Sequence, residues 1–233
     1  MDVSEAFVAA AALFVGGDAA FYSIVGLSLT VTLTAVLAAS LLGLPLGALL
    51  ALSRFRGRSA VIIIVNGLMG LPPVVAGLIV FLLLSRSGPL GSLGLLFSPM
   101  AMVVAQTLLV LPIIVAITRQ LIEDLYREYR EHLISVGLSG IRAIPTLLWD
   151  GRFALTTAVL AGFGRASAEV GAVLIVGGNI AGYTRTMTTS IALETSKGDL
   201  PLALGLGIVL ILLTLLINAF TYGASRLGAR FAG

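Results

Sequence analysis

Five long apolar stretches constrain the fold of this chain more than any other feature of its sequence. A helix that crosses a bilayer needs about 20 predominantly apolar residues. Five segments meet or approach that length: residues 24–52, 60–84, 100–117, 153–176 and 200–222. Each is continuously apolar, whereas a membrane β-barrel is built from shorter strands of alternating polarity. The sequence therefore predicts an all-α integral membrane protein with about five transmembrane helices within residues 24–225.

The composition supports a membrane location. Hydrophobic residues make up 58% of the chain and charged residues 11%, whereas an ordinary soluble domain has roughly 25% charged residues. The first 23 residues lack the basic start of a secretory signal, since Asp2 and Glu5 precede an apolar run over residues 6–15. We expect residues 1–23 to form an N-terminal interfacial segment, in which that run is a short helix at the membrane surface.

Basic residues predict the orientation of the helices, because cytoplasmic loops of membrane proteins are enriched in lysine and arginine. The loops and tail on one side hold Arg54, Arg56, Arg58, Arg119, Arg127, Arg130, Arg142, Arg152, Arg226 and Arg230. The loops on the other side hold only Arg86, Arg185 and Lys197. The arginine-rich side is expected to be cytoplasmic, with the N-terminus outside and the C-terminus inside. The basic residues form no continuous stripe, so no nucleic-acid partner is expected.

The side chains that usually carry catalysis or bind metals are scarce. The sole lysine, Lys197, does not belong to a P-loop motif, so the chain has no ATP site of that kind. One histidine, His132, and no cysteine make a metal site or a serine–histidine–aspartate triad improbable. No catalytic residue, metal or cofactor is therefore expected, and His132 is interpreted as a solvated or packing residue.

The charged segment over residues 118–152 predicts a short amphipathic helix on the cytoplasmic side, around residues 127–144. One helical face collects the apolar residues Leu125, Tyr129, Leu133 and Val136. Gly137 and Gly140 are expected to end or bend this helix and let the chain turn back. The helix either packs on its own protein or fills a groove on a cytoplasmic partner, and the periodicity does not distinguish the two.

Prolines interrupt three of the five predicted spans, at Pro45, at Pro72 and Pro73, and at Pro112. A proline inside a helix removes a hydrogen bond and kinks the axis. Membrane helices tolerate such breaks where they pack together or line a watery path. Pro72, Pro73 and Pro112 are therefore candidates for a translocation pathway, with a simple packing kink as the alternative.

Glu169 lies inside the fourth predicted span, and Arg165 precedes it by four residues on the same helical face. Charges within a bilayer are costly and usually mark either a functional site or a buried ion pair. Both residues are candidates for the translocation pathway. A purely structural ion pair is the alternative, and the sequence leaves both interpretations open.

The segment over residues 177–199 is rich in glycine and threonine and is expected on the outer side. A short helix is predicted over residues 184–195, with Met187 and Ile191 on one face. Polar residues that offer a hydrogen-bonding surface include Asn179, Arg185, Thr186 and Thr188. An ordinary ordered loop is the alternative.

Taken together, these residues resemble the permease subunit of a type I ABC importer. Glu131 and Gly137 are six residues apart in the cytoplasmic segment, as in the E-A-A loop of that family, although the two alanines are replaced by His132 and Leu133. Longer stretches resemble tungstate-uptake permeases of the Tup type: residues 70–77, 82–91, 105–112, 161–172, 176–185 and 193–198. The resemblance covers nearly the whole chain after about residue 20.

The resemblance implies a non-catalytic pore subunit that forms a homodimer in the plasma membrane of a prokaryote. A separate ABC ATPase would bind a coupling helix between the third and fourth spans, at Arg127, Arg130, Glu131, Gly137 and Ile141. An external oxyanion-binding protein would contact Asn179, Arg185, Thr186 and Thr188. The implied cargo is tungstate, with molybdate or sulfate as alternatives. A proton-coupled carrier that uses Glu169 and a membrane scaffold without transport are the rivals outside this family.

Overall fold

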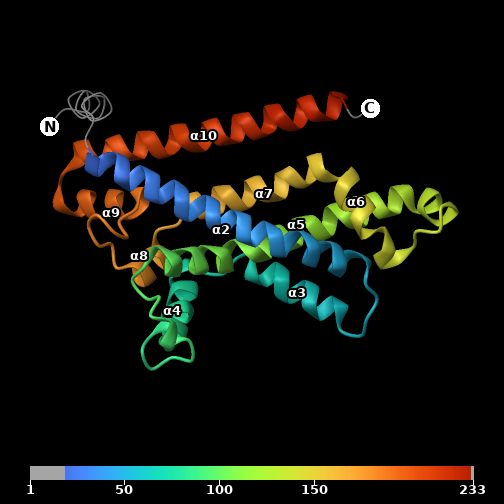
Figure 1. Ribbon diagram of the computed structural model, residues 1–233, viewed down its shortest axis with the longest axis horizontal. Helices are drawn as coiled ribbons and strands as arrows, with labels where there is room; N and C mark the ends of the chain where they lie inside the picture. The colour runs from blue at the N-terminus through green and yellow to red at the C-terminus, as the bar shows by residue number, and fades with distance from the viewer. Residues whose placement is uncertain (1–18, 232–233) are drawn as a thin grey trace. The chain divides into compact units, whose positions relative to one another are not determined.

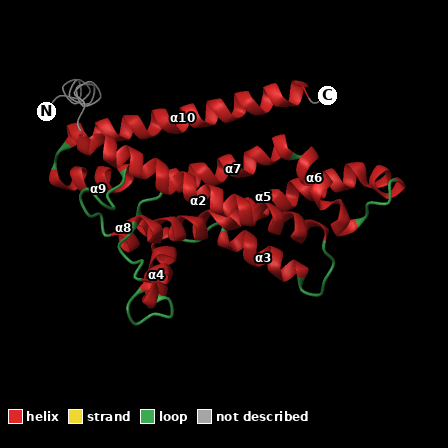
Figure 2. Cartoon of the chain, in the orientation of Figure 1, coloured by secondary structure: helices red, strands yellow, loops and turns green. Residues whose placement is uncertain are grey.

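The computed structural model describes residues 19–231 of the chain, and it describes the side chains up to Thr221 together with Gly223. All regular structure in this range is helical, and Figure 2 shows no strand in it. The interfacial helix predicted over residues 6–15 lies outside the described residues. The last five residues of the predicted interfacial segment belong instead to the first described helix, which begins at Ala19.

The order of the helices along the chain follows the colours and labels of Figure 1. The elements are α2 (Ala19–Leu52), α3 (Arg58–Leu68), α4 (Pro73–Leu84), η1 (Gly91–Leu93), α5 (Pro99–Ser135), η2 (Gly140–Ala143), α6 (Ile144–Asp150), α7 (Arg152–Ser167), α8 (Gly171–Gly177), α9 (Met187–Lys197) and α10 (Leu200–Phe231).

The prediction of about five spans is confirmed, but two of them are broken. In the described part of the chain, α2, α5 and residues 200–221 of α10 are each long and apolar enough to cross a membrane. The pair α3 and α4 and the pair α7 and α8 each qualify only together, because a short break bends each pair. The second and fourth spans are therefore not the continuous helices that their hydropathy suggested.

The third predicted span is longer than expected. Helix α5 continues from Pro99 to Ser135, a length of about 55 Å at 1.5 Å per residue. Its charged second half was predicted as a separate short helix, and that prediction is wrong. No residue between 117 and 135 interrupts the helix, because this stretch holds neither a proline nor a glycine. Only the glycines after Ser135 end it.

The described residues form two compact units. The first contains residues 19–35, 72–106 and 165–217. In it, α4 packs against α8 (Figure 1), and Gly77 makes their close approach possible. A β-carbon on Gly77 would lie 2.7 Å from the Cα atom of Ala172. Elsewhere in this unit, Phe21, Met187, Leu206 and Val209 form a buried apolar cluster.

The other unit contains residues 36–71, 107–164 and 218–231. Its core brings together α2, α5, η2, α6 and α7 through the buried residues Ala48, Ala51, Ile122, Leu133, Ala143, Leu147 and Leu155. Helices α2 and α5 approach closely at Gly47, where a β-carbon would lie 2.7 Å from the carbonyl oxygen of Val115. This unit includes the whole predicted cytoplasmic segment.

Candidate functional site

The turn after α5 is built by a glycine. Gly137 has φ of 79°, in the left-handed region that favours glycine. Its N–H donates to the carbonyl of Ile134 at 3.0 Å, and the N–H of Leu138 donates to that of Leu133 at 2.8 Å. This pair of bonds is the Schellman motif, which satisfies the last carbonyls of a helix. The prediction that Gly137 ends the helix is confirmed.

The chain after this turn is held back against α5. Gly140 also has a positive φ, of 56°, and its N–H donates to the hydroxyl of Tyr126 at 3.1 Å. Leu133 is 4% exposed and Ala143 is fully buried in the same core cluster. The turn is therefore anchored on both sides and does not hang freely from the end of α5.

The turn leaves apolar side chains in contact with solvent. Ile134 is 50% exposed, Val136 58% and Ile141 54%. We call these three residues the turn surface. Of the apolar stripe predicted on this helix, Leu133 is buried, whereas Tyr129 is 41% exposed and Val136 is exposed beyond the end of α5. Sequence periodicity missed Ile134, since it lies off the stripe, and only its exposure beside the turn reveals it.

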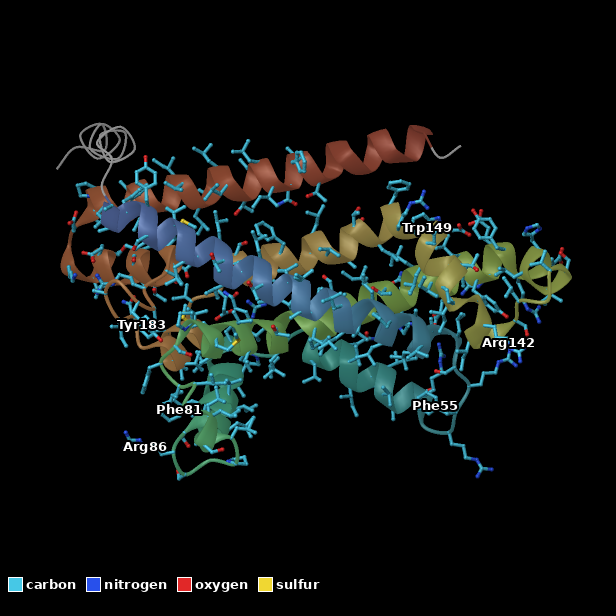
Figure 3. The ribbon with its side chains drawn as sticks, in the orientation of Figure 1. Phe55, Phe81, Arg86, Arg142, Trp149 and Tyr183 are labelled. Carbon is cyan, nitrogen blue, oxygen red and sulfur yellow. The ribbon has the colours of Figure 1, made fainter. Side chains whose placement is uncertain are left out.

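The predicted ATPase-coupling residues fall into two groups. Gly137 and Ile141 lie at or beside the turn surface, while Glu131 is exposed one helical turn earlier. Arg127 and Arg130 instead line a polar cavity at the ends of α2 and α5. Trp149 of α6 is also exposed (Figure 3). The guanidinium of Arg152 stacks on its ring, 4.6 Å from the ring centroid.

Arg165 and Glu169 form an ion pair at the break between α7 and α8. Arg165 Nη1 lies 2.7 Å from Glu169 Oε2, and the Glu169 side chain is only 1% exposed. The other carboxylate oxygen, Oε1, accepts the backbone N–H of Ala172 at 2.9 Å. Both oxygens of Glu169 are thus occupied, one by the preceding helix and one by the first turn of α8. This geometry matches the structural interpretation of the pair.

The Arg165–Glu169 break is further tied to neighbouring elements of the same unit. The hydroxyl of Thr188 in α9 donates to the carbonyl of Glu169 at 2.8 Å. Gln106 of α5 donates through Nε2 to the carbonyl of Ala166 at 3.2 Å. A helix break inside a membrane leaves backbone groups that need partners. Side chains of α5 and α9, together with Glu169 in the break itself, supply them here.

Among the prolines, only Pro72 and Pro73 coincide with a break. Pro72 is the N-cap of α4 in an extended conformation, and Pro73 is its first residue, where the missing N–H costs nothing. Pro112 and Pro45 lie inside the continuous helices α5 and α2. Gly171 at the start of α8 faces Pro73 and Val74, so two helix beginnings of the same unit meet there.

The segment over residues 177–199, predicted to face outward, is ordered by its threonines. Thr186 is 3% exposed and caps α9 in a reciprocal capping box with Thr189. Thr184 is buried, donates to the carbonyl of Gly177 at 2.6 Å and accepts the N–H of Ile180 at 2.9 Å. Together with the bond from Thr188, these contacts turn the predicted hydrogen-bonding surface mostly inward. The predicted short helix is α9. Its Met187 belongs to the buried cluster with Phe21, Leu206 and Val209, and Ile191 packs against that cluster.

The segment over residues 177–199 still presents other residues to solvent. Tyr183 is 53% exposed and Ile180 45%, on the loop between α8 and α9 (Figure 3). Asn179, with φ of 50°, and Arg185 are half-buried on the same loop. Sequence patterns did not predict Tyr183 and Ile180 as contact residues, because a hydrogen-bonding surface is recognised by polar side chains and these two are mainly apolar. The available signal was the pair of glycines at 178 and 182, both with positive φ: Ile180 lies between them and Tyr183 directly follows the second.

Ser28 connects α2 to the start of α9. Its hydroxyl accepts the N–H of Met187 at 2.7 Å and donates to the carbonyl of Ile24 at 2.7 Å. We expect Ser28→Ala to lower the free energy of unfolding by about 1–3 kcal/mol, because the buried N–H of Met187 loses its partner. Thermal unfolding of the purified protein in detergent measures this. Thr30→Ala is the control, since Thr30 makes the same bond within α2 but is exposed; equal losses in both variants would contradict the bridging role.

Comparison with known proteins gives relatives across most of the chain, while no family model matches it. A tungstate uptake system permease protein TupB from Peptoclostridium acidaminophilum is 40% identical over 94% of this chain and 96% of its own length. A probable anion ABC transporter permease protein from Haloferax volcanii is 40% identical over 90% of this chain and 89% of its own. A sulfate transport system permease protein CysW from Synechocystis is 29% identical over 84% and 74%.

Proposed function

Because the chain belongs to the family of ABC transporter permease proteins, we propose that it forms the membrane pore of an ATP-driven importer of tungstate. It is an integral membrane protein of the cell membrane with several crossing helices. The observation that carries the proposed cargo is the 40% identity to a tungstate uptake permease over nearly the full length of both chains.

The proposed working unit contains two copies of this chain, two copies of a separate ABC ATPase and an external protein that delivers the oxyanion. The ATPase would bind the turn surface, with Glu131 flanking it. Three exposed apolar side chains on an anchored turn are suited to fill a groove on a partner. The delivering protein would contact the loop between α8 and α9, near Asn179, Arg185 and Tyr183, on the side that we place outside the membrane.

The unbroken helix α5 suggests how ATP binding would move the pore. A helix of about 55 Å exceeds the roughly 30 Å hydrocarbon thickness of a bilayer, so its end reaches well beyond the membrane. Closure of the ATPase dimer would displace the turn surface, and α5 would carry this displacement into the membrane as a rigid body. Alternating exposure of the pore to the two sides would follow.

The turn surface provides the test of the proposed ATPase contact. Ile141→Glu places a charge at the centre of an apolar contact, and we expect at least a tenfold loss of the ATPase that co-purifies with the permease. ATP-driven tungstate uptake in vesicles should fall in parallel. The measurement is quantitative mass spectrometry of the complex purified from membranes that contain both subunits.

Two control variants accompany this test. Leu93→Glu introduces the same charge at a residue of similar exposure, 57%, at the end of η1. Ile141→Leu keeps the apolar character and should retain the ATPase. Full retention of the ATPase by Ile141→Glu would rule out the turn surface as its binding site.

Sulfate is the second candidate cargo, because a sulfate permease is 29% identical over 84% of this chain. Molybdate resembles tungstate in shape and charge and is tested together with tungstate and sulfate. Uptake of the three oxyanions by the complete importer, each competed by the other two, distinguishes the candidates. We expect tungstate to compete most strongly; preferential uptake of sulfate would overturn the tungstate assignment and leave the permease function intact.

A further inference from the structure

A polar cavity lies at the ends of α2 and α5, within a single unit of the chain. Its volume is about 370 Å³. Four arginines line it: Arg54, Arg58, Arg127 and Arg130. Glu123 is the one carboxylate in its lining, so the described walls carry a clear excess of positive charge.

The single carboxylate is already occupied. Glu123 pairs with Arg58 and, through Oε2, with Arg119 at 2.8 Å. Arg58 also donates through Nε to the carbonyl of Leu50 at 2.9 Å and through Nη2 to that of Ala51 at 3.1 Å, so it closes the end of α2. Arg58 and Glu123 therefore form the fixed base of the cavity.

Within the described part of the chain, Arg54, Arg127 and Arg130 have no strong ion-pair partner, so their charge is available to bind an anion. Arg127 meets Asp124 at 3.5 Å, but both side chains are largely exposed, at 77% and 58%, and such a pair contributes little. Among the described residues, no ion pair joins Arg54 or Arg130 to a carboxylate. Arginine is well suited to bind phosphate, because its planar guanidinium presents several donors at once.

An apolar groove of about 360 Å³ lies next to this cavity in the same unit. Helices α2, α3 and α5 line it, with side chains that include Leu49, Val61, Val65 and Val115. Ser53 belongs to the linings of both the groove and the cavity, so the two are adjacent. Helix α3 has no buried residue, and the groove is therefore open along it.

We propose that the cavity and the groove form one binding site for an anionic phospholipid. The phosphate of the headgroup would sit among the arginines, and an acyl chain would lie along the groove. This occupant matches both halves: a free oxyanion would leave the groove empty, and a neutral lipid would leave the arginines unpaired. A second copy of the chain related by twofold symmetry would bring like arginines together at this surface. Basic pockets beside membrane helices are a known setting for anionic headgroups.

The test measures lipid retention by the purified permease with native mass spectrometry. The probes are phosphatidylglycerol, phosphatidylcholine, glycerophosphoglycerol, which has the headgroup without acyl chains, and inorganic phosphate. We expect phosphatidylglycerol to be retained and the other three to be retained at least tenfold less. Arg54→Gln should weaken phosphatidylglycerol binding about fivefold, the expected effect of one arginine near an anionic lipid surface.

Matched variants separate this site from general attraction between the protein and anionic lipid. Arg56→Gln removes an exposed arginine of the same loop that does not line the cavity, and it should leave retention unchanged. Val65→Gln in the groove should weaken phosphatidylglycerol but not the binding of any headgroup probe. Equal effects of Arg54→Gln and Arg56→Gln would overturn the proposal. So would tight binding of inorganic phosphate alone, which would make the cavity a site for a free oxyanion.

Discussion

Replacing Glu169 with alanine is expected to lower the free energy of unfolding by about 3 kcal/mol, the low end of the range for breaking a buried ion pair. The substitution leaves the guanidinium of Arg165, which is 25% exposed, without its carboxylate, and it removes the acceptor for the N–H of Ala172. We expect a loss at the low end of that range because Arg165 is partly exposed. Thermal unfolding in detergent, followed by size-exclusion chromatography, measures the loss.

An exposed ion pair is the control for this prediction. Asp124→Ala breaks the contact with Arg127, in which both side chains face solvent, and should change the stability by no more than about 0.5 kcal/mol. Glu169→Gln distinguishes structure from proton transport, because it retains an oxygen for Ala172 but removes the titratable proton site. If uptake falls only in proportion to the amount of folded protein, the structural role is supported. A fully folded Glu169→Gln variant without uptake would contradict it.

Replacing Gly77 with alanine is expected to destabilise the protein by about 1–3 kcal/mol, the usual cost of forcing extra atoms into a packed core. The added β-carbon would lie 2.7 Å from the Cα atom of Ala172 and 3.3 Å from its carbonyl oxygen. Both are backbone atoms of α8, so no side chain can rotate away, and α4 must separate from α8. The same unfolding assay measures the effect.

Gly26→Ala provides the matched control for Gly77. Gly26 lies in α2, within the same unit, and a β-carbon there would meet no atom within 4 Å. Alanine favours a helix over glycine by roughly 0.5–1 kcal/mol, so this variant should be neutral or slightly more stable. If Gly77→Ala were as stable as Gly26→Ala, the close packing of α4 on α8 would not occur in the protein.

Hydropathy predicted the number of crossing segments well but not their continuity. The second span has almost no polar residue, and only Pro72 and Pro73 indicated that α4 would begin afresh there. Pro112 carries the same local signal, yet α5 continues past it. A proline costs a helix one hydrogen bond, and whether the chain then bends depends on what packs around it.

Local chemistry was sufficient at the turn after α5. Gly137 ends the helix because a left-handed residue is needed there, and this requirement is visible in the sequence alone. The exposure of Ile134 was not visible, because a helical stripe does not show where the core lies. The inward orientation of Thr186 was hidden for the same reason: a threonine that caps a helix and one that contacts a partner look alike in a sequence.

The sequence by itself determined the membrane character, the set of crossing segments, the end of α5 and the family. These depend on composition, on local backbone preference and on identity along the chain. The tertiary structure alone decided which charges meet. It placed Arg54 and Arg58 beside Arg127 and Arg130, about 70 residues later, and it seated Glu169 between Arg165 and the start of α8. Such contacts depend on how helices pack, and packing is a property of several segments at once.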